Sequence, residues 1–201
     1  HYVHETINNS IWQDVCQDML GDANPELHLE QAKVVLSFGA DFLGTWGSPV
    51  HFAKEYAKFR NSPRGTLIQV EPKMTLTGAN ADHWVPIRPG TEGAFALRIA
   101  NLLVNKHHRD VSALPADLVK QINKYDLEKV KTVTGATGEQ LIRIAQLLNG
   151  RSPSLVIAGA SAEGHEHGYE NVAAAMLLNL IRGNVGKTIK PSGQLPFPQM
   201  A

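Results

Sequence analysis

Two short apolar runs separated by a helix pattern constrain the fold of this chain more than any other feature. The run "KVVLSFG" ends at Gly39, and the run "TLIQV" ends just before Glu71. Between them, "SPVHFAKEYAKFR" offers Ser48 as a helix N-cap and Pro49 at the first helical position. Strand, helix and strand within residues 33–70 predict parallel strands joined by a right-handed crossover.

A second junction lies in "HWVPIRPGTEGAFALRIANLLV", where an apolar strand end runs through a tight turn into a helix pattern. Pro89 fixes its own φ, Gly90 allows a left-handed backbone, and Thr91 offers an N-cap hydroxyl. A helix start gathers free N–H groups and the positive end of the helix dipole, which suits a phosphate or another polar ligand group. Many helices begin in this way without a ligand. The predicted buried face of the helix, which ends near residue 106, consists of Phe95, Ile99, Leu102 and Leu103.

The rest of the chain repeats the order of strand, glycine loop and helix. Helical patterns over 116–132 and in "GEQLIRIAQLLNG" precede "RSPSLVIAGA", a buried strand that ends at Gly159, and the helix "GYENVAAAMLLNLIRG". We predict an α/β fold with a Rossmann-like parallel sheet flanked by helices and a second α/β portion. The predicted divisions are an N-terminal helical segment at 1–27, a Rossmann-like dinucleotide-binding unit at 28–106, the second α/β portion at 116–193 and an extended tail at 194–201. The stretch 73–82 is weakly patterned and predicts a connection without an element of its own.

Composition excludes several classes of function. The 201 residues are 43% hydrophobic, and 19 basic residues balance 19 acidic ones, which argues against nucleic acid as a partner. The longest apolar runs are far shorter than the roughly 20 residues that span a bilayer, so we expect no direct membrane insertion. The first residues, "HYVHETINNS", contain no recognisable targeting signal and fit a start within a longer protein.

Cys16 is the only cysteine in the chain. A single thiol excludes an internal disulfide and a four-thiolate iron–sulfur site within these residues. It lies in "IWQDVCQDML", beside the helically spaced Ile11, Val15 and Met19. We therefore predict a buried structural thiol and not a nucleophile.

In a doubly wound sheet, ligands bind beyond the carboxyl ends of the strands. Four features of this chain follow strand ends: the loop from Gly39 through Trp46, Glu71 with Lys73, the turn from Pro89 to Glu92, and the loop from Gly159 through Tyr169. Glu71 is the sharpest candidate, because a carboxylate at the end of the second strand of such a unit is well placed to accept hydrogen bonds from ribose hydroxyls. The alternative is a solvated surface glutamate.

Other motifs fail on closer reading. The first loop, "GADFLGTWGSP", lacks the G-x-G-x-x-G fingerprint, so an NAD-type site is not expected. The segment "GNVGKT" has Ile181 where a phosphate loop needs glycine, and we read Gly183 as a helix C-cap. In "GHEHG", His165, Glu166 and His167 lack a further ligand, which favours solvent or cofactor contact over a metal. We predict no catalytic residue and no metal ligand in this chain.

Taken together, the motifs resemble the large subunit of the molybdopterin oxidoreductase superfamily, which includes dimethyl sulfoxide reductase. The resemblance covers about residues 28–193 and is most specific in "GTLIQVEPKMTLTGANADHWVPIRPGTEGAFALRIANLL". It implies that this face holds one guanine dinucleotide arm of a bis-molybdopterin cofactor. By this resemblance, the Gly39 to Thr45 loop would line the nucleotide, Glu71 would hold ribose and Lys73 would lie near phosphate. In the nucleotide-facing junction that Pro89 and Gly90 begin, Thr91 with Glu92 would meet the base or its ribose.

The family pattern has Asp where this chain has Glu at 71 and 92, and a longer carboxylate shifts its oxygens by more than about 1 Å. The chain resembles most a branch found in membrane quinol-oxidising assemblies, the molybdopterin-oxidoreductase-like subunit of alternative complex III. This resemblance implies an alternative role as a cofactor-free structural subunit that scaffolds iron–sulfur and haem partners.

In either role, the implied partners are the remaining domains of the same large subunit and iron–sulfur and membrane quinol-binding subunits. The implied location is the periplasmic side of the cell envelope, with membrane association through partners, and these residues alone would not be catalytic. A further alternative is an independent soluble nucleotide-binding module.

Overall fold

A computed structural model describes residues 10–192 of the chain, and its centre is a four-stranded parallel sheet. The strand order is β4-β3-β2-β5. The strands are β2 (Val34–Phe38), β3 (Thr66–Glu71), β4 (His83–Pro86) and β5 (Ser154–Ala158). All neighbouring pairs run parallel, which confirms the predicted sheet.

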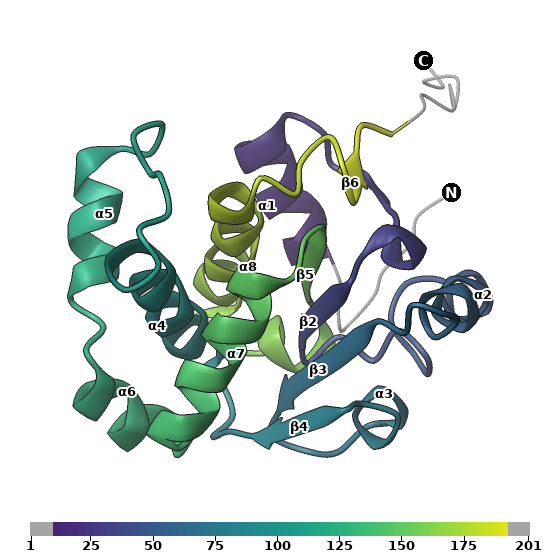
Figure 1. The fold of residues 1–201 in the computed structure, drawn as a ribbon, viewed down its shortest axis with the longest axis horizontal. Coiled ribbons are helices and arrows are strands. Elements are labelled where there is room, and N and C mark those ends of the chain that lie inside the picture. The colour runs from purple at the N-terminus through teal and green to yellow at the C-terminus, as the bar shows by residue number, and fades with distance from the viewer. Residues whose placement is uncertain (1–9, 193–201) are drawn as a thin grey trace.

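Helices cover the two faces of the sheet (Figure 1). The crossover helix α2 (Pro49–Phe59) and the short α3 (Leu76–Ala79) lie on one side. On the other side are α4 (Glu92–Asn105), α5 (Ala116–Asn123), α6 (Leu127–Thr134), α7 (Gly138–Gly150) and α8 (Gly168–Arg182). The first helix, α1 (Ser10–Leu20), packs on α8. The remaining elements are a small antiparallel pair, β1 (Glu26–Leu27) with β6 (Ile189–Lys190), and two 3-10 turns, η1 (Leu29–Gln31) and η2 (Ala160–Ala162).

Strand β5 returns from the second half of the chain to pair with β2 along their whole length. The predicted Rossmann-like unit and the second portion therefore share one sheet and one hydrophobic core. The core continues from the sheet into α4, where Phe95 meets Phe38 of β2 edge to face at 6.0 Å between ring centroids. The predicted boundaries between the portions stay a prediction, and the predicted tail at 194–201 lies outside the described residues.

Side chains close the outer edge of β5. The Asn179 side chain of α8 accepts a hydrogen bond from the N–H of Val156 at 2.9 Å and donates one to its C=O at 2.7 Å. At Ser154, the Asn184 side chain accepts a hydrogen bond from the N–H and the Thr188 hydroxyl donates one to the C=O. An edge whose main-chain groups are already paired cannot recruit another strand, so the sheet ends at β5.

Several local predictions are confirmed. The side chains of Phe95, Ile99, Leu102 and Leu103 are buried on α4, and Cys16 is fully buried. Burial also raises the pKa of the Cys16 thiol to about 12, with a smaller contribution from Asp22. Gly183 ends α8 in a left-handed conformation with φ of 62°.

Two local predictions were wrong. The stretch 73–82 contains the one-turn helix α3, because the Thr75 hydroxyl accepts a hydrogen bond from the N–H of Gly78 at 3.1 Å and caps a turn too short for periodicity to reveal. The helical pattern over 116–132 divides into α5 and α6, because the Asp126 carboxylate accepts from the N–H of Lys129 and starts a new helix. Within residues 10–192, no helix is both long and apolar enough to cross a membrane.

Candidate functional site

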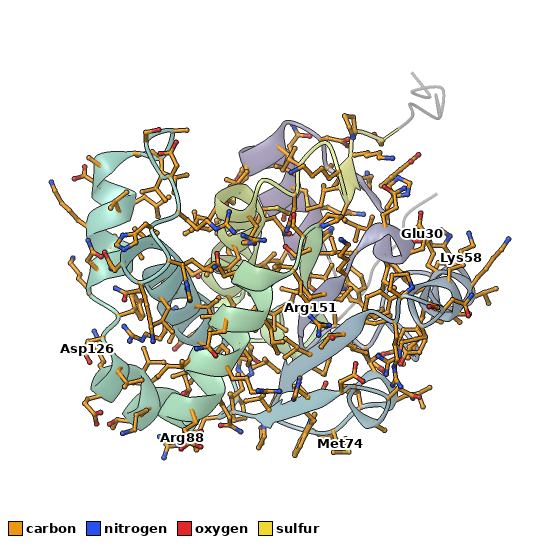
Figure 2. The ribbon with its side chains drawn as sticks, in the orientation of Figure 1. Glu30, Lys58, Met74, Arg88, Asp126 and Arg151 are labelled. Carbon is orange, nitrogen blue, oxygen red and sulfur yellow. The ribbon has the colours of Figure 1, made fainter. Side chains whose placement is uncertain are left out.

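The carboxyl ends of the strands place the predicted site residues at one edge of the sheet. Glu71, the last residue of β3, pairs with Pro86 at the end of β4, and the N–H of Ile87 donates to the Glu71 carbonyl. Met74 and Arg88, which follow these two strands in the chain, both project along the lower margin of the molecule in Figure 2. Glu71 and the turn before α4 therefore belong to the same edge.

The chain's own donors occupy the Glu71 carboxylate. Oε1 accepts from the Thr75 N–H at 2.8 Å and from Trp84 Nε1 at 3.2 Å, and Oε2 accepts from Gln69 Nε2 at 2.8 Å. The Thr75 hydroxyl lies within 3.1 Å of both oxygens. Glu71 is only 1% exposed, so its contacts tie β3 to the start of α3 and to β4. The neighbouring Lys73 is exposed to solvent.

The loop after β2 contacts both the loop after β5 and α3. Gly39 has φ of 65°, and a Cβ there would lie 2.1 Å from Oγ of Ser161, so only glycine fits. Asp41 accepts hydrogen bonds from the N–H and the hydroxyl of Thr77, at 3.0 and 2.7 Å, and joins this loop to α3. Thr45 is exposed and lines a separate cavity of about 670 Å³ between α1 and α2.

Glu92 has the most unusual surroundings of the predicted site residues. It is 0% exposed at the first position of α4, and its Oε1 is 3.4 Å from the Ser161 hydroxyl. Its Oε2 is buried and has no hydrogen-bond partner among the described residues. Burial raises the pKa of the Glu92 carboxyl, while nearby backbone N–H groups, His165 and Ser161 oppose the rise. A buried hydrogen-bond acceptor without a donor lowers the stability of the fold, unless a ligand or another group supplies the donor.

Thr91 occupies the predicted N-cap position of α4, but its hydroxyl does not cap the helix. The Thr91 hydroxyl donates to the Arg88 carbonyl at 2.6 Å and makes no cap hydrogen bond to the helix. Asn171 of α8 caps the helix instead, because its Oδ1 accepts from the N–H of Gly93 at 2.8 Å. Its Nδ2 donates to the carbonyl of Ala162 at 3.1 Å. No local pattern reveals a cap that comes from 78 residues away.

Sequence reasoning also missed Glu163, in the loop after β5. Its Oε1 accepts from the N–H of Trp12 in the first turn of α1 at 2.9 Å, and its Oε2 accepts from the N–H of Ala160 at 3.2 Å. The residue is 4% exposed. Burial is the largest influence on its carboxyl and raises the pKa to about 7, although the two N–H groups lower it.

The raised pKa of Glu163 predicts a pH dependence of stability. Between about pH 4.5 and 7 the folded state holds a proton that the unfolded state has released, so the free energy of unfolding falls as pH rises through this window. The loss is at most about 3 kcal/mol, at 1.36 kcal/mol for each pH unit. Urea unfolding of the wild type and Glu163→Gln at pH 4.5 and 7.5 measures it. Glu55 shifts in the same direction, and the paired comparison removes its contribution.

Glu166→Gln is the matched control for this prediction, since Glu166 is exposed in the same loop. At either pH this surface substitution should change the free energy of unfolding by less than about 0.5 kcal/mol. A difference between wild type and Glu163→Gln that stays constant across the window would show that Glu163 has an ordinary pKa.

The structure divides the eight predicted site residues into three groups. Gly39 and the junction Pro89, Gly90, Thr91 and Glu92 gather around the loop after β5, where a Cβ on Gly90 would lie 3.3 Å from the His165 ring. Glu71 and Lys73 lie beside α3, and Thr45 lies in the cavity between α1 and α2. His165, Glu166 and His167 are exposed, and no three metal-ligating side chains among residues 10–192 are close enough to hold an ion. The first group offers a buried carboxyl that can accept N–H or O–H donors.

Known proteins resemble this chain along most of its length. The family model described as molybdopterin oxidoreductase matches residues 5–197. The menaquinone reductase, molybdopterin-binding-like subunit, of Nitratidesulfovibrio vulgaris is 33% identical over 175 residues, which is 84% of this chain and 25% of that protein. The dimethyl sulfoxide reductase DmsA of Escherichia coli is 27% identical and is matched over 89% of this chain and 26% of that protein.

Among solved structures, acetylene hydratase from Pelobacter acetylenicus matches with a TM-score of 0.68 and 20% identity, over 87% of this chain and 24% of that chain. This match supports the fold alone. The chain spans about a quarter of the length of the curated relatives named above. The family model covers nearly all of the chain, and the chain therefore belongs to the molybdopterin oxidoreductase family.

Proposed function

We propose that this chain is part of the large subunit of a molybdopterin-dependent oxidoreductase and contacts the guanine dinucleotide arm of a bis-molybdopterin cofactor through Glu92. The observation that carries the proposal is the buried Oε2 of Glu92, which has no partner among the described residues. Guanine presents an imino and an amino N–H on one edge, and a carboxylate accepts two parallel donors of this kind. Such a cofactor, when bound, supplies oxidation and reduction at its metal.

The other predicted residues fit this cofactor unequally. Gly90 and Thr91 border Glu92 and line a cavity of about 360 Å³ with His167 and Asn171. Gly39 would help to place Ser161 next to Glu92, and Pro89 would shape the turn before α4. Lys73 and Thr45 are free to approach phosphate groups from the solvent side. The contacts of Glu71 do not favour a ribose-holding role, because its oxygens already accept from Gln69, Thr75 and Trp84.

Glu92→Gln tests the proposal. The amide turns a donor toward the guanine edge, and losing one charge-assisted hydrogen bond costs about 1.5–3 kcal/mol, or about 10- to 100-fold in affinity. The protein would be purified from its source cells with its associated subunits, and the guanine nucleotide released by acid denaturation would be quantified. Glu166→Gln should release as much as the wild type. A wild type and a Glu92→Gln variant that release equal amounts would refute the contact.

A second candidate function is a cofactor-free structural subunit of a membrane quinol-oxidising complex of the alternative complex III type. The observation in its favour is that both predicted nucleotide-facing carboxylates are closed off, since Glu71 is 1% and Glu92 0% exposed. A relative named as a molybdopterin-binding-like subunit of a menaquinone reductase fits this role. The role implies iron–sulfur, haem and membrane quinol-binding partners on the periplasmic side. A purified complex that releases neither guanine nucleotide nor molybdenum would support it over the first proposal.

A further inference from the structure

We infer that the β5–α8 loop, residues 159–167, is a lid closed over Glu92, and that Glu163 and Asn171 are positioning residues that hold the lid shut. The inference deepens the proposed function and rests on it, because the lid decides whether a nucleotide reaches the Glu92 carboxyl. Three helices, α1, α4 and α8, meet at this loop and contact it or its neighbours.

The loop supplies the atoms that cover Glu92. The Ser161 hydroxyl is 3.4 Å from Glu92 Oε1. The His165 ring packs against Gly90, where a Cβ would lie 3.3 Å from it. Glu92 is 0% exposed beneath this cover, although it stands at the carboxyl edge of the sheet. A ligand can contact its orphan oxygen only after the loop has moved.

Two side chains fasten the loop to the rest of the fold. Glu163 joins the loop backbone at Ala160 to the first turn of α1 at Trp12. Asn171 joins the loop carbonyl of Ala162 to the N–H of Gly93 at the start of α4. Both residues are 4% exposed, so their hydrogen bonds are shielded from water. Removing the Glu163 side chain breaks the attachment of the loop to α1 and leaves the attachment to α4 through Asn171 in place.

The loop backbone has the features of a movable segment. Ala160 has φ of 46°, a left-handed conformation that is unfavourable for a residue other than glycine. Residues 164–167 are exposed, and the His165 ring lies against Gly90. Gly168 closes the segment, and a Cβ there would lie 2.2 Å from the Glu163 carbonyl. The closed form is therefore tightly packed at its end and strained at its start.

Thiol labelling measures the opening. Ala162 is 0% exposed within the loop, so the reagent 5,5′-dithiobis(2-nitrobenzoate) reaches a cysteine in Ala162→Cys only when the loop opens. Cys16 adds little background, because it is fully buried and its pKa is raised to about 12. Glu163→Ala added to Ala162→Cys should speed labelling by about 10- to 100-fold, which corresponds to losing two hydrogen bonds at about a factor of three to ten each. Glu163→Gln keeps one of the two acceptor oxygens and turns an N–H donor toward the other backbone N–H, so labelling should be slower than in Glu163→Ala but faster than with Glu163 in place.

The urea dependence of labelling separates a lid from a merely structural role. Local opening exposes little surface, so its rate should change little with urea, whereas labelling through global unfolding rises steeply. Labelling of Ala162→Cys as fast as that of Glu166→Cys, or a steep urea dependence, would overturn the lid. An unchanged rate in the Glu163→Ala background would overturn the role of Glu163.

Binding of GDP distinguishes failure of the lid from failure of the proposed function. If both hold, Glu163→Ala should raise the association rate of GDP by the same factor as the labelling rate. Fast labelling in Glu163→Ala with no GDP binding to any variant would keep the lid and reject the nucleotide contact. GDP binding whose rate does not change in Glu163→Ala would keep the contact and reject the lid.

Discussion

Replacing Phe95 by alanine is expected to lower the free energy of unfolding by about 3–5 kcal/mol, the usual range for removing a buried aromatic ring. Phe95 is 0% exposed on α4 and meets Phe38 of β2 edge to face, at 6.0 Å between centroids and an interplanar angle of 69°. The substitution removes the packing between helix and sheet and leaves a cavity that the surrounding core cannot fill. Urea unfolding followed by circular dichroism measures the change.

Phe95→Leu is the matched control for this substitution. It keeps most of the apolar volume and loses the aromatic contact, so it should cost markedly less than Phe95→Ala. A loss below about 1 kcal/mol for Phe95→Ala would show that the ring does not pack between α4 and β2, since even modest core truncations cost that much.

Replacing Asn179 by leucine is expected to cost about 2–4 kcal/mol, although the two side chains have similar volumes. The side-chain amide satisfies both the N–H and the C=O of Val156 on the outer edge of β5, and it also accepts from Asn184 Nδ2 at 2.8 Å. Leucine leaves these buried groups without partners, at about 1–3 kcal/mol for each, and the burial of its own apolar side chain offsets part of this loss. Chemical denaturation measures the loss, and hydrogen exchange at the Val156 amide should accelerate.

Asn123→Leu is the control for Asn179→Leu, because Asn123 is exposed and its side chain accepts a hydrogen bond from Asn105 at the surface. It should change the free energy of unfolding by less than about 0.5 kcal/mol, as is usual at the surface. Equal effects of the two substitutions would mean that the edge of β5 is not closed by Asn179.

Glu71 and Glu92 show why local sequence predicts the place of a site better than its chemistry. Glu71 ends β3 and Glu92 begins α4 after β4, and both lie at the predicted edge of the sheet. Gln69, Thr75 and Trp84 donate hydrogen bonds to both oxygens of the Glu71 carboxylate. Glu71 therefore joins β3 to α3 and β4. Glu92 keeps an oxygen that has no hydrogen-bond partner among residues 10–192, beneath a loop that is 69 residues away in the chain. The difference depends on neighbours that only folding brings together.

The sequence by itself determined the parallel strands, the buried face of α4, the helix stop at Gly183 and the buried thiol of Cys16. Each follows from periodicity or from a backbone preference that acts over a few residues. Only the tertiary structure decided that β5 joins β2, that Asn179 ends the sheet, and that Asn171 and Glu163 hold the loop over Glu92. These features depend on contacts between residues that are far apart in the chain, such as hydrogen bonds across 23 and 151 positions. Such contacts form only when the chain folds, so no local sequence pattern predicts them.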